Sequence, residues 1–344
     1  MVVPTRCTEP TIRGRSAYTV LGFLGYAVSN ILGIILASLW GFSLRDRLIV
    51  FLVPPLAFVA VVFTARLVLR EERIVFYQVA TAAVGSVALV GLAVGADVTR
   101  CMDAVVTGVG TFLVFGRLGC FRVACCHGRP AKFGVTYGPD HVRVGFWSRW
   151  SGRRLWPVQL VESGVTLALV AIALGAGWDT PGRPTLIYAI GYGVCRFFLE
   201  TRRGDATRPH AYGLSEAQLT SLLTLVVCAI WRPSLWSLGA VTLVAIASLR
   251  IALVRKRREL EAPPHIREVD RLCSAAVASG ERRESTLGLM VSCHRLADGR
   301  NDWVMSSTHP AWSEATANRI ATMLWQDHEL LAGRTPGVIH VITL

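Results

Sequence analysis

The stretch AYTVLGFLGYAVSNILGIILASLWGFSL, from Ala17 to Leu44, contains no charged residue and decides the fold class of this chain. Two further runs, Leu48 to Ala65 and Ile74 to Ala96, are similarly apolar. Each is long enough, or nearly so, to cross a hydrocarbon core at about 1.5 Å per helical residue. The first run is too long for a signal-peptide core and no small-residue cleavage pattern follows it, so we expect it to remain as an anchor.

Shorter apolar runs continue this pattern along the chain. They lie at Ala104 to Gly116, Ser163 to Trp178, Thr185 to Cys195, Ala217 to Trp231 and Pro233 to Leu249. Of the 344 residues 52% are hydrophobic, and the mean hydropathy of +0.46 is too high for an ordinary soluble protein of this size. We therefore predict an all-α polytopic membrane protein with seven or eight transmembrane helices in a lipid bilayer.

The net charge of +13 comes almost wholly from arginine, because all but two of the 36 Lys and Arg residues are Arg. A GC-rich genome is an equally good explanation of this bias. The functional interpretation is that a planar guanidinium group binds phosphate in two places, which suits an anionic lipid. Nucleic acid is a poor partner for a chain this apolar, so we predict no nucleic-acid binding.

The composition changes after the last apolar run, where RKRREL is followed by Pro263 and Pro264. We predict a transmembrane domain over 1–254, a linker over 255–264 and a small soluble α+β domain over 265–344. Its predicted elements are a helix near Ile266 to Ser279, strands from Thr286 to Arg295 and Asp302 to Ser307, a helix from about Trp312 to Leu330, and a strand from Gly337 to Thr343. We recognise no catalytic or metal motif in this domain.

A long polar insertion, from Arg129 to Trp156, interrupts the apolar runs. Its segment HVRVGFWSRWSGRRLW interleaves tryptophan with arginine. Both side chains have an apolar body and a polar end, which the headgroup layer of a membrane favours. We predict an interfacial arm over about 129–156; a plain solvated loop is the alternative.

Two of the predicted spans carry polar and ionisable residues at helical spacing. The fourth span contains Asp103, Thr107, Thr111 and Arg117, and the sixth contains Tyr192, Arg196 and Glu200. Ionisable groups inside a membrane are costly and mark a functional site or a buried pair. The structural alternative is that Arg196 and Glu200, one turn apart, form an ion pair that binds no substrate.

Two further helix starts carry polar residues that, taken singly, are typical of helix capping. They are Gln159 with Glu162, and Ser215 with Gln218 and Ser221. Together with the two polar spans they occur in an order that resembles the prolipoprotein diacylglyceryl transferase family, over roughly residues 17 to 232.

Four motifs carry this resemblance. The family signature GRxGNFxNxExxG ends the fourth span, where GRLGCFRVACCHG retains Gly116, Arg117, Gly119, Phe121 and Gly128. A PSQLYE element opens the fifth span and is matched by Pro157, Gln159, Leu160 and Glu162. A YGxxRFxxExxR element in the sixth is matched by Tyr192, Gly193, Arg196, Phe197, Glu200 and Arg203. A GLSxGQxLS element begins the seventh, with Gly213, Leu214, Ser215, Gln218 and Ser221.

The chain also departs from the family pattern. Cys120 replaces the asparagine of the signature and Cys125 replaces its glutamate. The family's Gly-Gly element early in the third span, preceded in many members by histidine, reads Phe76 to Val79 here. No histidine precedes His127, which excludes a histidine base from that span. A branch of the family has GCFxxGCCYG at the signature, so the cysteine version resembles a variant.

The resemblance implies an enzyme that moves the diacylglyceryl group of phosphatidylglycerol to the lipobox cysteine of a pre-lipoprotein, releasing glycerol phosphate. The implied partners are phosphatidylglycerol and pre-lipoprotein signal peptides. The implied location is the bacterial cytoplasmic (inner) membrane, as a multi-pass protein. This chemistry needs cations on the leaving phosphate, a group that takes the thiol proton, and a dry cavity open to lipid.

The same resemblance assigns roles to residues of this chain. Arg117 and Arg196 hold the phosphate, and Glu200 orients Arg196. Tyr77 and His127 are candidate bases; His127 titrates in the useful range, although it would equally serve as a cap at a helix end. The residues assigned to substrate binding are Gly116, Gly119, Gly128, Gln159, Glu162, Tyr192, Ser215 and Gln218.

The cysteines near the signature invite other interpretations. Cys120, Cys125, Cys126 and His127 offer soft ligands, but their spacing is not a usual zinc pattern and adjacent cysteines seldom bind one ion, so we predict no metal and no cofactor. A disulfide between two of them is favoured over a metal if this end faces the oxidising periplasm, as the family's topology implies. The alternative function is a non-catalytic paralogue that binds lipid or peptide in the same cavity.

Overall fold

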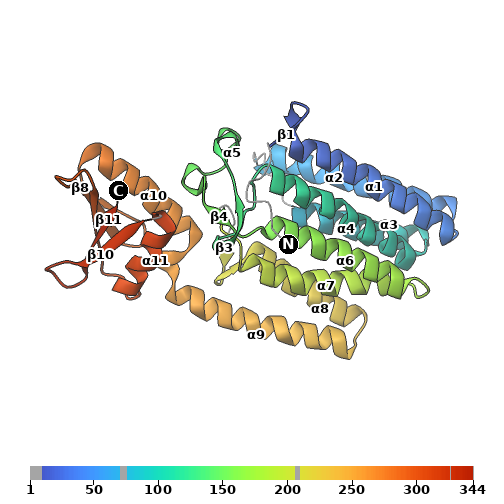
Figure 1. Cartoon of the computed structure of the whole chain (residues 1–344). Helices are drawn as coiled ribbons and strands as arrows, with labels where there is room; N and C mark the ends of the chain where they lie inside the picture. Colours follow the sequence, from blue (N-terminus) through green and yellow to red (C-terminus); the bar gives the residue numbers. More distant parts are fainter. Residues whose placement is uncertain (1–9, 70–75, 206–209, 326, 344) are drawn as a thin grey trace. The chain divides into compact units, whose positions relative to one another are not determined.

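The structure, a computed structural model, describes residues 10–69, 76–205, 210–325 and 327–343 (Figure 1). The chain divides into two compact units. The first consists of residues up to Arg203 together with Glu216–Ile246, and the second of Gly204–Ser215 together with Ala247–Leu344. The predicted linker over 255–264 is largely helical, because one helix ends at Arg257 and the next begins at Pro263.

Long helices dominate the first unit. Six are long and apolar enough to cross a membrane: α1 (Ala17–Leu39), α2 (Leu44–Thr64, continued by the π-helical turn Ala65–Leu69), α3 (Phe76–Val94), α4 (Val98–Arg122), α6 (Val158–Gly177) and α9 (Leu235–Arg257). Two others, α7 (Arg183–Glu200) and α8 (Glu216–Trp231), are more polar or shorter. The part of the chain that the structure describes thus has eight long helices before Pro263, and the protein is a polytopic membrane protein.

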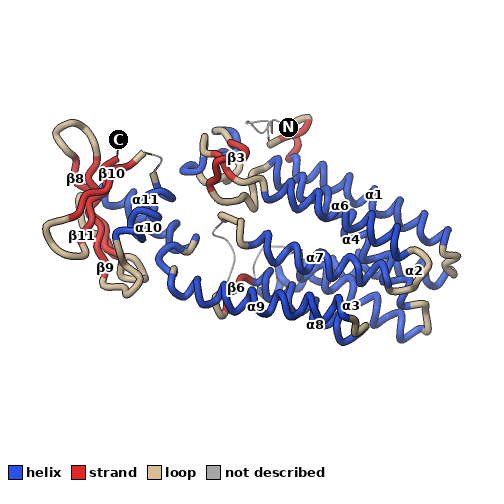
Figure 2. The backbone as a smooth tube through the Cα atoms, turned by 60° about the horizontal axis from the view of Figure 1, so that its bottom comes forward, coloured by secondary structure: helices blue, strands red, loops and turns tan. Residues whose placement is uncertain are grey.

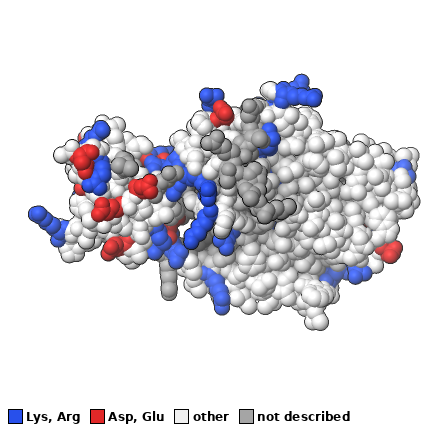
Figure 3. Space-filling view, in the orientation of Figure 1, with Lys and Arg blue, Asp and Glu red and all other residues white. Residues whose placement is uncertain are grey.

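The outer surface of these helices is apolar. Phe23, Leu56 and Leu89 are 72%, 67% and 72% exposed, respectively. The face seen in Figure 3 has a broad area without charged side chains over the long helices. Exposed apolar surface of this extent is unfavourable in water and favourable against lipid tails. The surface therefore supports the assignment of the helices to a bilayer.

The most buried of the long helices is α4, which packs against α1, α3, α6 and α7. Small residues permit these close approaches: a Cβ atom on Gly110 would lie 2.6 Å from the ring of Tyr188 on α7. The first turn of α4 is capped by Asp97, whose side chain accepts a hydrogen bond from the Arg100 amide. Because α4 is the most buried of these helices, a polar side chain on it lies inside the bundle.

The insertion between α4 and α6 forms a compact arm. Its elements are β3 (Pro130–Thr136), α5 (Pro139–Arg143), a 3₁₀ turn (Ser148–Trp150) and β4 (Arg154–Leu155), with β3 and β4 antiparallel. Trp150 is buried against Trp147, with ring centroids 5.4 Å apart, and the Arg153 guanidinium lies 5.1 Å from the Trp150 ring centroid. The arm is thus a folded element rather than an irregular loop, and its contact with the headgroup layer stays a prediction.

The second unit contains the predicted soluble α+β domain. Its five-stranded antiparallel sheet has the order β10-β11-β9-β8-β7, with α10 and α11 on one side (Figure 2). The bounds are α10 (Pro263–Ser279), β7 (Arg283–Glu284), β8 (Leu289–Arg295), β9 (Asn301–Ser307), α11 (Glu314–Leu324), β10 (His328–Ala332) and β11 (Val338–Thr343). Short pairs complete the chain: β1 (Thr11–Ile12) with β2 (Arg15–Ser16), and β5 (His210–Ala211) with β6 (Leu214–Ser215).

One predicted element of this domain is wrong. The helix expected from about Trp312 to Leu330 ends at Leu324, and His328 to Ala332 instead form β10. Trp325 has extended backbone angles, φ −126° and ψ 146°, which end the helix without a glycine or proline signal. The following residues pair with the last strand, where Leu330 lies opposite Val341.

Candidate functional site

The predicted site residues come from helix ends that lie at one end of the bundle. Arg117 is in the last turns of α4, and Arg196 is in the last turns of α7. Glu162 is near the start of α6, and Tyr77 is near the start of α3. Two of these residues are near the ends of their helices and two are near the starts, so the helices run in opposite directions where the residues meet. Because α4 packs against both α6 and α7, the four residues come together.

One carboxylate oxygen links the two predicted phosphate-binding arginines. The Nε atom of Arg117 lies 3.0 Å from Oε1 of Glu162, and the Nε atom of Arg196 lies 3.4 Å from the same oxygen. The Tyr192 hydroxyl donates a hydrogen bond of 2.8 Å to it. The three charged side chains are at most 6% exposed. The structure therefore places both guanidinium groups in one buried cluster.

Arg196 contacts several members of this cluster. Its Nη2 atom lies 2.6 Å from Oε2 of Glu200, and its Nε atom donates a hydrogen bond of 2.6 Å to the Tyr77 hydroxyl oxygen. Its side chain is fully buried, yet Nη1 has no hydrogen-bond partner among the described residues. A buried donor without an acceptor is costly, so this nitrogen is a candidate for binding an anionic ligand.

A third guanidinium, that of Arg203, completes the cluster. Its Nε atom lies 3.8 Å from Oε2 of Glu200, and its side chain is 4% exposed. Arg203 matches a family motif in the sequence but has no predicted role; its three-residue spacing from Glu200 is the signal that could have given it one. The three guanidinium groups of Arg117, Arg196 and Arg203 thus lie near the carboxylates of Glu162 and Glu200 in one buried place.

The loop that follows α4 is tied to the same helices. The Gln159 side chain donates a hydrogen bond of 2.8 Å from Nε2 to the carbonyl oxygen of Cys125. Gly128 forms an antiparallel bridge with Arg203, and a Cβ atom there would lie 2.2 Å from the Trp156 carbonyl oxygen. Gln159 and Gly128, both predicted to bind substrate, therefore position the loop in this structure.

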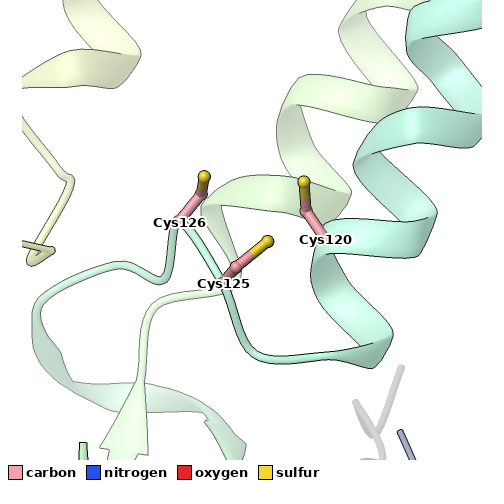
Figure 4. Close-up of side chains that lie close together, drawn as sticks. All are labelled: Cys120, Cys125 and Cys126. Atoms are coloured by element: carbon pink, nitrogen blue, oxygen red, sulfur yellow. The ribbon is translucent and has the colours of Figure 1, made fainter. Parts of the chain in front are cut away.

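Three cysteines of this loop and helix end lie side by side (Figure 4). The Sγ atoms of Cys120, Cys125 and Cys126 are all within 4.8 Å of one another. Hydrogen bonds with Cys120 and Cys125 hold the pKa of the Cys126 thiol well below its ordinary value, and the charges of Arg203 and Arg117 lower it further. The same contacts with Cys120 and Cys126 raise the pKa of Cys125. The eight described cysteines are all unbridged, so the expected disulfide is not formed here.

Two other predicted site residues, His127 and Gly119, pack against neighbouring elements. His127 packs against Phe146 and Trp150 of the arm, with ring centroids 5.5 and 6.2 Å away, and its Nδ1 atom is 2.9 Å from the Gly128 carbonyl oxygen. Gly119 permits close packing of α1, since a Cβ atom there would lie 3.1 Å from Cα of Tyr18.

Gly116 has open space where a side chain would begin, because a Cβ atom there would meet nothing within 4 Å. Gln218 is buried on α8, where its Nε2 atom lies 3.5 Å from the Phe197 carbonyl oxygen. Ser215 is buried in the second unit.

The polar residues predicted along one face of α4 have different partners at the two ends of the helix. Asp103 accepts hydrogen bonds from the amides of Gly182 and Thr185 and from the Thr185 hydroxyl, at 2.8, 3.0 and 2.7 Å. It thereby caps the start of α7. The hydroxyls of Thr107 and Thr111 donate to backbone carbonyls of their own helix. Only the Arg117 end of this face is in the charged cluster.

Comparison with known proteins identifies relatives of the segment that carries these residues. Residues 74–232 match the family model described as "Prolipoprotein diacylglyceryl transferase". A Clostridium tetani protein named phosphatidylglycerol–prolipoprotein diacylglyceryl transferase is 31% identical over 140 residues, which cover 38% of this chain and 51% of that protein. Phosphatidylglycerol–prolipoprotein diacylglyceryl transferase 2 of Clostridium perfringens is 30% identical over 134 residues, covering 38% and 50%. The chain thus spans about half the length of these relatives, and the resemblance to their family is confirmed.

Proposed function

Given this relationship to a family of membrane transferases, we propose that the protein transfers the diacylglyceryl group of phosphatidylglycerol to the lipobox cysteine of pre-lipoproteins. The proposed location is the bacterial inner membrane, where both substrates are found. The observation that carries the proposal is the pair of buried guanidinium groups, Arg117 and Arg196, that share one oxygen of Glu162. The names of the relatives support the substrate classes.

The positive charges in the cluster suit a reaction in which a phosphate ester is the leaving group. In the proposed reaction a thiolate attacks a glyceryl carbon, a C–S bond forms, and the C–O bond to phosphate breaks. Negative charge on the departing glycerol phosphate would be stabilised by Arg117 and Arg196, and the low dielectric of a buried site strengthens this attraction. The free Nη1 atom of Arg196 supplies a donor that no described residue uses.

The remaining cluster residues would hold these arginines in place. Glu162 fixes the two guanidinium groups relative to each other, and Glu200 holds Arg196 from the next turn of its own helix. Tyr77 also holds Arg196, because its hydroxyl oxygen accepts a hydrogen bond from the Arg196 Nε atom. Preorganised charges of this kind cost no rearrangement when the leaving group departs.

Complementation tests the proposal. A bacterium depleted of its own diacylglyceryl transferase should grow when it expresses this protein, and should fail with Arg117→Ala or Arg196→Ala at equal protein levels. Arg183→Ala is the matched control, because Arg183 is exposed at the other end of α7. If the wild-type protein is well expressed and gives no lipoprotein with a diacylglyceryl thioether, the proposed activity is wrong. If both alanine variants rescue as well as wild type, the site is wrong.

A non-catalytic paralogue is the second candidate function. It is favoured by the replacement of the family's asparagine and glutamate by Cys120 and Cys125. Such a protein would bind phosphatidylglycerol or a signal peptide and would form no thioether product. Binding of phosphatidylglycerol to purified protein, lost in Arg196→Ala and accompanied by no transfer, would support it.

A further inference from the structure

The three cysteines Cys120, Cys125 and Cys126 have a geometry that their spacing in sequence does not predict. Adjacent cysteines seldom face one point, but here Ala124 and Cys126 adopt φ angles of +60° and +56°, which residues with a side chain rarely do. These two turns direct the neighbouring thiols toward Cys120 in the last turn of α4 (Figure 4). The backbone therefore holds three sulfur atoms within 4.8 Å of one another.

This spacing suits a soft metal ion. In a zinc site with Zn–S distances of about 2.3 Å, tetrahedral geometry puts the sulfur atoms about 3.8 Å apart. The three sulfur atoms would have to close by about an ångström at most. Thiolates select soft or borderline ions such as Zn²⁺ over Mg²⁺ and Ca²⁺. Three protein ligands, rather than four, are typical of catalytic zinc sites, in which the fourth position takes water or substrate.

The charges around the cysteines suit the same ion. Three thiolates and one Zn²⁺ together carry a single negative charge, and the positive charges of Arg203 and Arg117 act on Cys126. The loop is fixed by the hydrogen bond from Gln159 to Cys125, so the ligands are held before an ion binds. A preorganised and electrically compensated thiolate group is the expected form of a functional metal site.

The cluster is also accessible. Cys125 is exposed and lines a cavity of about 400 Å³, together with Tyr18, Val123 and Val144. A ligand in that cavity could reach an ion held by the three sulfur atoms. Cys120 follows Arg117 by three residues on one helix, so the two side chains are neighbours on its surface. The ion would therefore lie about one helical turn from the charged cluster.

We propose that Cys120, Cys125 and Cys126 bind a zinc ion whose fourth position takes the acceptor thiol. The inference rests on the proposed function, in which that thiol must lose a proton before it attacks. The chain has no histidine in the third span to take this proton, and Tyr77 is already bonded to Arg196. A thiol that coordinates zinc is deprotonated outright, so the metal would replace the histidine base that the third span lacks.

The step balances without an oxidant or a reductant. The acceptor thiol binds zinc and releases its proton to water. The zinc-bound thiolate then forms the C–S bond, and the electron pair of the broken C–O bond leaves on the phosphate oxygen of glycerol phosphate. The product is a neutral thioether, a weaker ligand than a thiolate, so it dissociates and leaves the fourth position available.

Metal binding is tested on the full-length protein purified in detergent. Elemental analysis should find about one zinc per chain, and replacement by Co²⁺ should give a thiolate-to-cobalt charge-transfer absorption. Cys120→Ser, Cys125→Ser and Cys126→Ser should each lower zinc affinity at least about tenfold. Cys228→Ser is the matched control, because Cys228 is a buried cysteine of α8. Less than about a tenth of a zinc per chain after incubation with zinc, or unchanged affinity in all three variants, overturns the proposal.

Thiol binding and transfer are measured separately. A lipobox peptide should change the visible spectrum of the cobalt form, whereas the same peptide with serine in place of cysteine should not; equal effects overturn the proposal. Transfer from phosphatidylglycerol should fall at least about 100-fold in Cys126→Ser and stay at wild-type level in Cys228→Ser. Unchanged transfer in Cys126→Ser overturns the zinc role but leaves the proposed function intact. Peptide-dependent spectral change without transfer in wild type overturns the proposed function and supports the thiol-binding metal site.

Discussion

The two ends of α4 bury opposite charges in different ways. At one end Asp103 is fully buried and accepts three hydrogen bonds from the start of α7. At the other end Arg117 joins a buried charged cluster, in which Nη1 of Arg196 has no partner among the described residues. A buried charge whose hydrogen bonds are complete contributes to the fold, whereas one that lacks an acceptor is suited to a ligand.

Arg196 gives the largest expected effect. We expect Arg196→Ala to reduce transfer about 10³-fold, or about 4 kcal/mol, because a preorganised donor on the leaving group is removed. Arg196→Lys should retain part of the activity, since lysine keeps the charge but loses the planar fork. The measurement is the rate of thioether formation with phosphatidylglycerol and a lipobox peptide. Arg183→Ala should keep the wild-type rate, and equal rates in Arg196→Ala and wild type would contradict the assignment.

Asp103 should affect stability rather than chemistry. Asp103→Ala leaves two amides at the start of α7 without their acceptor, and we expect it to lower the free energy of unfolding by about 3 kcal/mol. Its transfer rate per folded molecule should stay within about threefold of wild type. Unfolding of the purified protein in mixed detergent measures the free energy of unfolding, and single-turnover experiments measure the transfer rate. A large loss of rate with unchanged stability would place Asp103 in the site.

Two glycines of the signature differ in their surroundings: one is closely packed and the other faces open space. A Cβ atom on Gly128 would lie 2.2 Å from the Trp156 carbonyl oxygen, so Gly128→Ala must shift the loop. We expect it to lower transfer about tenfold, equivalent to about 1.4 kcal/mol. Gly116→Ala meets no atom within 4 Å and should leave stability unchanged or slightly raised, as expected for alanine in a helix. If Gly116→Ala lowers transfer without lowering stability, Gly116 lines the substrate path.

Helical spacing predicted the Arg196–Glu200 pair, because residues four apart share a face. The sharing of Glu162 by Arg117 and Arg196 could not be predicted in this way, since it depends on how α4, α6 and α7 pack. The order of the motifs was the only sign that these helix ends meet. Sequence therefore predicted the members of the cluster better than their contacts.

Irregular backbone was harder to predict. The left-handed angles at Ala124 and Cys126 occur without a glycine, so no residue marked the turn that gathers the thiols. The end of α11 at Leu324 likewise lacks a glycine or proline, and the apolar pair Leu330 and Leu331 fits a helix as well as a strand. In both places tertiary contacts, rather than local preference, decide the conformation.

The second unit buries an ionisable side chain in a third way, by keeping it neutral. The Nδ1 atom of His265 lies 2.7 Å from the Leu260 carbonyl oxygen, and its Nε2 atom lies 2.8 Å from the Ser285 hydroxyl. With a proton on Nδ1, the ring donates to Leu260 and accepts from Ser285. Burial lowers the pKa of His265 below its ordinary value of 6.5. Protonation would place a charge among partners that suit the neutral ring.

This buried histidine gives the smallest expected effect, a dependence of stability on pH. Below pH 6.5 the unfolded chain takes up a proton that the folded domain resists, so stability should fall as the pH drops, by at most about 1.4 kcal/mol per pH unit. Above that pH the histidine should contribute no slope. Hydrogen exchange at the amides of Val291 and Met305, corrected for intrinsic rates, measures this in the full-length protein. The slope should be absent in His265→Gln, and an identical slope in that variant would assign the effect to another group.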